Sequence, residues 1–407
     1  MKALQLFTIC AMTIFTVTVS TPSSALAAPD EVNTEPLVKG NTAFALDLYS
    51  TLQKREGNLF FSPYSIATAL AMTYGGARGD TQKEMAETLK FTHDQNQLHA
   101  AFARLQSQLN TEQDKGEIEL SVANALWAEK SYSFLENFIH MINKNYGATL
   151  NRVDFKNTPE QTRTQINEWV EEKTKDKIKD LIKPGVLNSL TRLVLTNAIY
   201  FKGNWSHQFK KSATKENTFW IAPDKAIMVP LMTQKDDFAY GENENMQILE
   251  LPYVGNRLSM IILLPKTIDG LSELETTLTV ENLTLWTGLL RKREVRVFLP
   301  KCTVTSEFNL EQTLSAMGMS DAFTTKADFS GMTGNKDLFM STVIHKAFVD
   351  IHEEGTEAAA ATAVTMRMTA MPTPPPEFRA DHPFLFLIRH NPSESILFLG
   401  RVADPTQ

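Results

Sequence analysis

The chain has 407 residues, of which 43% are hydrophobic and 21% charged, a composition that indicates a folded protein with a large core and excludes a disordered chain. Its formal net charge is −7, and its longest basic block is residues 291–293, so we expect neither a nucleic-acid nor a membrane partner. Two cysteines and eight scattered histidines exclude a disulfide scaffold, a zinc ribbon and an iron–sulfur site, and we expect no metal or other cofactor.

The first 27 residues have the pattern of a secretory signal peptide. Lys2 precedes an apolar run over residues 3–19, and Ala25-Leu26-Ala27 is a small-x-small cleavage pattern. The alternative is an N-terminal membrane anchor, but the run is short and interrupted by threonines. We therefore expect export to the extracellular space, or to the periplasm in a bacterium. The mature chain would then keep one cysteine, Cys302, which we expect to be buried.

Residues 28–407 are expected to form a single domain, because no linker, low-complexity block or repeat interrupts them. Apolar residues at helical spacing predict helices over residues 63–74, 98–109, 134–146 and 159–170. Strand-like runs follow later in the chain, at residues 192–201, 258–264, 295–299, 342–351 and 383–388. This order predicts an α+β fold, with helices packed around large, mainly antiparallel sheets.

Residues 353–376 form an unusually long connection between two of these apolar strands, since most connections span about 4–6 residues. Alternate positions, which would share one face of an extended strand, are uncharged: Thr356, Ala358, Ala360, Thr362, Val364 and Met366. The charged Glu357 and Arg367 fall on the other face. The segment therefore has the pattern of an exposed loop that could enter a sheet, with Gly355 as a hinge. An Ala-rich helix or a flexible linker is the alternative.

Several stretches resemble the serpin family of serine protease inhibitors. Residues 353–363 (EEGTEAAAATA) are similar to the proximal hinge of inhibitory serpins, and residues 378–386 (FRADHPFLF) resemble the signature that follows the reactive loop. Further similar motifs occur at residues 58–66, 167–178, 196–205, 251–253 and 398–405, so the resemblance covers about residues 36–405. The hinge would comprise Glu353, Gly355, Thr356, Glu357, Ala358, Ala359, Ala360 and Ala361.

The resemblance implies the serpin fold, with an exposed reactive-centre loop at about residues 353–376, and a protease inhibitor that is not an enzyme. Together with the signal-peptide pattern, it predicts a secreted inhibitor. In the family mechanism a protease cleaves the loop and becomes acylated, and the loop then inserts into the large sheet before the ester hydrolyses. The expected partner is a serine protease, or a cysteine protease, and the inhibitor would be a monomer.

Two clusters of controlling residues carry over by position. The polar "shutter" under the middle of the sheet would be Ser62, Ser65, Asn197 and His345. Taken singly, each of these residues would be read as a helix cap, an ordinary polar residue or a buried core histidine. The "breach", where the loop enters the sheet, would be Lys301, Trp205 and Glu353. None of these residues would be catalytic.

Counting from Glu353 places the reactive bond between Thr369 and Ala370, with Met368 and Arg367 as alternatives for the residue before it. Small residues there suit an elastase-like protease, and Met368 suits a chymotrypsin- or subtilisin-like protease. The rival function is a non-inhibitory serpin that acts as a carrier, chaperone or storage protein, but its hinge would tolerate charged or bulky residues. The common enzyme motifs HExxH, GxSxG and Walker A are all missing from the sequence.

Overall fold

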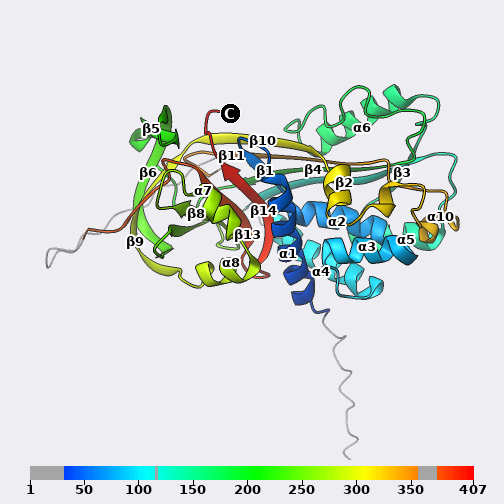
Figure 1. Cartoon of the computed structure of the whole chain (residues 1–407), viewed down its shortest axis with the longest axis horizontal. Helices are drawn as coiled ribbons and strands as arrows, with labels where there is room; N and C mark the ends of the chain where they lie inside the picture. Colours follow the sequence, from blue (N-terminus) through cyan, green and yellow to red (C-terminus); the bar gives the residue numbers. More distant parts are fainter. Residues whose placement is uncertain (1–31, 115–117, 356–373) are drawn as a thin grey trace, which may run out of the picture. The chain divides into compact units, whose positions relative to one another are not determined.

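The computed structural model describes residues 32–114, 118–355 and 374–407 (Figure 1). The chain divides into two units, residues 1–32 and 33–407, and the helices and strands of the described residues belong to the second. Within the described ranges, no helix combines the length and the apolar character that a bilayer span requires.

The four predicted helices are confirmed as α2, α4, α5 and α6. Helix α2 begins where its sequence predicts, since Ser62 Oγ accepts a hydrogen bond from the Ser65 amide at 3.1 Å and Pro63 follows the cap. The helices are α1 (Glu35–Leu52), α2 (Pro63–Tyr74), α3 (Gly79–Leu89), α4 (Gln95–Asp114), α5 (Glu136–Tyr146), α6 (Pro159–Lys173), α7 (Leu271–Thr276), α8 (Val280–Thr287), α9 (Glu311–Ala316) and α10 (Ser330–Thr333), with 3-10 turns η1 (Lys211–Ala213) and η2 (Asp321–Phe323).

The described strands form two sheets. The five-stranded sheet has the order β10 (Cys302–Asn309), β11 (Thr342–Ile351), β4 (Leu193–Gly203), β2 (Ile118–Glu129) and β3 (Leu150–Val153). The nine-stranded sheet has the order β1 (Leu59–Phe61), β14 (Ser395–Val402), β13 (Phe384–His390), β8 (Leu258–Pro265), β7 (Met246–Pro252), β6 (Lys225–Glu242), β9 (Arg291–Pro300) and β12 (Glu377–Arg379), and β5 (Lys215–Ala222) pairs with β6. The five predicted strands are confirmed as β4, β8, β9, β11 and β13.

Most strand pairs are antiparallel, as predicted. Among the described strands, the parallel pairs are β2 with β3, β4 with β11, and β9 with β12. The α+β prediction is therefore confirmed.

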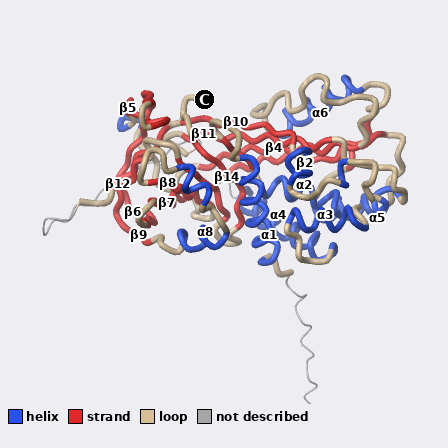
Figure 2. The backbone as a smooth tube through the Cα atoms, viewed as in Figure 1, coloured by secondary structure: helices blue, strands red, loops and turns tan. Residues whose placement is uncertain are grey.

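Helices cover both faces of the five-stranded sheet (Figure 2). Helix α2 contacts the face of β4 that carries Asn197. Helix α6 lies on the opposite face, where Ile166 and Val170 pack into a buried cluster with Val194 and Ala198. Side chains alternate along a strand, so β4 is buried on both faces, which explains its nearly continuous apolar sequence.

Candidate functional site

The junction between β4 and β11 is the feature of the sheet that bears on loop insertion. The two strands run parallel as direct neighbours, and their last paired residues are Tyr200 and Phe348. Beyond the end of β11 the chain turns back at residues 352–355, where the Gly355 amide donates to the His352 carbonyl at 3.1 Å. A segment that continued this reversal between the two strands would run antiparallel to both. The junction therefore has the orientation that an inserted strand needs.

The turn at Gly355 fits only a residue without a side chain. Its φ is +96°, and a Cβ atom there would lie 2.3 Å from the Trp205 amide nitrogen and 2.5 Å from the Gly203 carbonyl oxygen. The neighbouring backbone is tied to the same region, because Trp205 N donates to Glu354 O at 3.1 Å. The hinge glycine thus holds the start of the long connection against the end of β4.

Replacing Gly355 with alanine should disturb this attachment. We expect G355A to lower the free energy of unfolding by about 2–4 kcal/mol, because the clash is with backbone atoms and the φ is unfavourable. Urea unfolding followed by circular dichroism measures the change. G147A is the control, since Gly147 also has positive φ (+60°) but a Cβ there would have no neighbour within 4 Å. Equal losses in both variants would show that φ alone, and not the contact with β4, sets the requirement.

The predicted breach residues lie together. Glu353 is 4% exposed, and its carboxylate contacts Lys301 Nζ at 2.9 Å and accepts a hydrogen bond from Thr214 Oγ1 at 2.8 Å. Burial raises the pKa of Glu353, but the hydrogen bonds from Lys301 and Thr214 outweigh it, so the pKa lies below the ordinary value. The backbone carbonyl of Glu353 accepts from Phe209 N at 2.9 Å. The carboxylate is therefore ionised, and its contacts with Lys301 and Thr214 hold the start of the long connection in place.

Trp205, the third breach residue, fixes the other side of the same turn. Its indole stacks on Tyr253 with ring centroids 4.6 Å apart, and its Nε1 donates to the His352 carbonyl at 3.0 Å. Trp205 is 3% exposed. The sequence did not predict that Tyr253 would stack on Trp205 or that Thr214 would bind Glu353.

The four predicted shutter residues form one hydrogen-bonded network under the sheet. His345 Nδ1 donates to Asn197 Oδ1, and His345 Nε2 accepts from the Ser62 amide at 3.1 Å. Asn197 Nδ2 donates to Ser65 Oγ at 2.6 Å and also to Asn124 Oδ1. The network links α2 to β2, β4 and β11. Asn124 is a fifth member that the sequence reasoning missed.

His345 is the titratable member of this network. It is completely buried, and burial lowers its pKa to about 3, although a hydrogen bond with Asn197 acts in the opposite direction. The neutral ring matches its contacts, since Nε2 must accept from a backbone amide while Nδ1 donates.

This histidine should make the fold sensitive to acid. The unfolded chain protonates it near pH 6.5 and the folded chain only near pH 3, so stability falls as pH drops from about 6.5 towards 3. From pH 7 to pH 5 we expect the free energy of unfolding to fall by about 2 kcal/mol because of this group. In the H345Q variant, the free energy of unfolding should depend less on pH by that amount. Urea midpoints at both pH values test it, with the exposed His207 replaced in H207Q as control. An unchanged slope in H345Q would contradict the assignment.

Several predicted residues cannot be placed. The hinge positions 356–361 and the reactive-bond candidates at 367–370 lie outside the described residues. Cys302 is confirmed as a buried free thiol at the start of β10, and burial raises its pKa to about 12. In the described ranges no cluster of three or more His, Cys, Asp or Glu side chains could hold a metal ion.

The chain is similar to known proteins over most of its length. A sequence profile described as Serpin (serine protease inhibitor) matches residues 39–405. The leukocyte elastase inhibitor of Bos taurus is 46% identical over 381 residues, covering 91% of this chain and all of that protein, and human serpin B3 is 43% identical over 389 residues, covering 91% and 99%. The crystal structure of uncleaved ovalbumin is similar, with a TM-score of 0.82 and 31% identity, covering 91% of this chain and all of that one. The chain therefore belongs to the serpin family of serine protease inhibitors, which are not enzymes.

Proposed function

We propose that this protein is an exported suicide inhibitor of an elastase-like serine protease. The observation that carries the mechanism is the parallel β4–β11 junction, with the tight turn at Gly355 placed beside its end. A strand inserted there would replace one parallel pairing by two antiparallel ones. About twelve added residues at roughly 1 kcal/mol net per hydrogen bond would supply on the order of 10 kcal/mol.

The proposed target rests on two observations that do not depend on each other. Thr369 and Ala370 are small side chains at the expected reactive bond, and small pockets are typical of elastase-like proteases. Relatives of this chain are named leukocyte elastase inhibitors. Chymotrypsin- or subtilisin-like proteases remain the second choice if Met368 precedes the bond that is cut.

Export is part of the proposal and rests on the signal pattern of residues 1–27. The family match begins only at residue 39, so this segment precedes the matched domain. Expression of the full chain with N-terminal sequencing of the exported product tests it, and we expect the mature chain to start at Ala28. An uncleaved N-terminus retained with the cells would contradict export.

The inhibitory mechanism is tested by mixing the protein with elastase, chymotrypsin, subtilisin and trypsin. We expect a complex with elastase that survives SDS at the summed mass, and a released C-terminal peptide starting at Ala370. The variant T369R should transfer complex formation to trypsin, whereas A370R should not. Cleavage by every protease without a stable complex would favour the non-inhibitory alternative of a carrier, chaperone or storage protein.

A further inference from the structure

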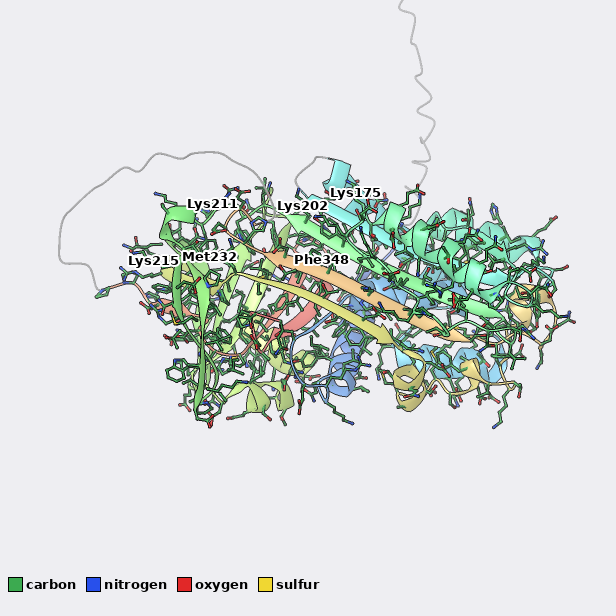
Figure 3. The ribbon with its side chains drawn as sticks, turned by 90° about the horizontal axis from the view of Figure 1, so that it is seen from above. Lys175, Lys202, Lys211, Lys215, Met232 and Phe348 are labelled. Carbon is green, nitrogen blue, oxygen red and sulfur yellow. The ribbon has the colours of Figure 1, made fainter. Side chains whose placement is uncertain are left out.

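A cavity of about 680 Å³ opens beside the C-terminal ends of β4 and β11, on the face of the sheet that carries α6. Tyr200 and Phe348 form part of its lining, with ring centroids 5.8 Å apart. Figure 3 labels Phe348 and three of the lysines around it. We call this cavity the lysine groove, after five lining residues that come from four parts of the chain: Lys175, Lys177, Lys202, Lys211 and Lys301.

Carboxylates also line the groove, but they lie deeper than the ammonium groups. Lys175 pairs with Glu119 at 2.7 Å, and their side chains are 67% and 24% exposed. Lys211 and Glu354, 2.6 Å apart, are 71% and 22% exposed, and Lys301 and Glu353 are 37% and 5% exposed. In each pair the acid forms the floor and the lysine reaches the rim. A solute that approaches from solvent therefore meets positive charge first.

The charge balance leaves room for an anion. Among the described lining residues, five lysines face four carboxylates, and the fourth carboxylate, Asp350, accepts a hydrogen bond from Thr303 Oγ1 at 3.1 Å. Lys177 has no carboxylate within ion-pair distance in the described part of the chain, and its Nζ lies over the Tyr200 ring at 5.7 Å. Exposed ion pairs are weak and exchange with solvent. A ligand with several negative charges could thus recruit Lys175, Lys177 and Lys211 without breaking the contact between Lys301 and the buried Glu353.

The two walls of the groove belong to opposite sides of the β4–β11 junction. Lys202 lies on β4 and pairs in register with Glu119 of β2, which binds Lys175. Asp350 lies on β11, and Glu353 binds Lys301 at the end of β9. A ligand that contacts both walls must dissociate, or its contacts must lengthen, before the two strands can separate.

We propose that the lysine groove binds small multivalent oxyanions, of the polyphosphate or polysulfate class, and that the bound anion holds β4 and β11 together and slows loop insertion. This inference rests on the proposed function for its kinetic consequence, but not for binding itself. Formation of the inhibited complex would then become slower as the concentration of such anions in the medium rises.

The test uses the mature protein with tripolyphosphate and, separately, a fully sulfated disaccharide, which distinguishes phosphate from sulfate sources. Calorimetry at 50 mM and 150 mM salt gives the affinity, which should fall with salt. The variant K175Q/K177Q/K211Q removes three rim charges and leaves Lys301 in place. The control R291Q/K292Q/R293Q removes three exposed charges from the basic block on β9. We expect at least about a tenfold loss of affinity in the groove variant and less than about twofold in the control.

Saturating anion should raise the thermal midpoint of the wild type and slow formation of the SDS-stable complex about three- to tenfold, with neither effect in the groove variant. Absence of binding, or an equal loss in the control, would overturn the site. Binding at the groove with unchanged complex formation would overturn its effect on the sheet. Failure of the proposed function is distinguishable, because it appears as a missing complex in the sample without anion.

Discussion

Arginine in place of Ala358 should convert the inhibitor into a substrate. Ala358 belongs to the uncharged set of alternate positions that would face inward if the loop entered the sheet. An ionised group buried there without a partner costs several kcal/mol. Even about 3 kcal/mol added to the insertion barrier slows that step about a hundredfold, whereas hydrolysis of the acyl-enzyme is unaffected. The protease would then be released with the loop cut.

The matched control is A359R, which puts the same charge one residue further along, on the opposite face. We expect A358R to lose at least about 90% of the SDS-stable complex with elastase while the loop is cut at an unchanged rate, and A359R to keep most of it. Gel densitometry and mass spectrometry of the released peptide measure both quantities. Comparable complex in the two variants would refute the assigned register of the loop.

The sequence was sufficient for elements whose pattern is local. Helix α2 has its capping Ser62 and Pro63 in consecutive positions, and β4 is apolar at nearly every residue because helices cover both of its faces. Strand β2 was not predicted, although it is 12 residues long. Ser121 on this strand is buried although it is polar, and Asn124 belongs to the shutter network beside α2. These polar residues interrupt the alternation of apolar and polar positions that marks a strand.

The site was predictable only as far as a family resemblance could place it. Glu353 and Lys301 were paired in this way, and the structure shows the contact. Thr214, which also binds Glu353, lies 139 residues away along the chain. No local pattern distinguishes such a threonine from an exposed one. Contacts of this kind arise from the packing of whole sheets, and a single sequence does not reveal them.

Replacing Asn197 with leucine should destabilise the native sheet more than any other single change in the shutter. The substitution keeps a side chain of similar size but removes the amide that accepts from His345 and donates to Ser65 and Asn124. Among the described residues, His345 Nδ1 would be left without a partner, and Ser65 Oγ and Asn124 Oδ1 would each lose one hydrogen bond while keeping the one between them. An unsatisfied buried group costs about 1–3 kcal/mol, and each lost hydrogen bond costs about 1 kcal/mol. Because the losses are not additive, we expect about 3–5 kcal/mol in total.

The chain offers a control of the same chemistry. Asn41 on α1 is 2% exposed, yet neither of its amide atoms has a hydrogen-bond partner among the described residues, so N41L should be neutral or stabilising. We expect N197L to lower the thermal midpoint by about 4–6 °C relative to N41L, measured at several scan rates because unfolding of a large chain can be irreversible. Equal midpoints in the two variants would mean that the hydrogen bonds of Asn197 do not hold the sheet closed, since burial and side-chain volume change in the same way at both sites.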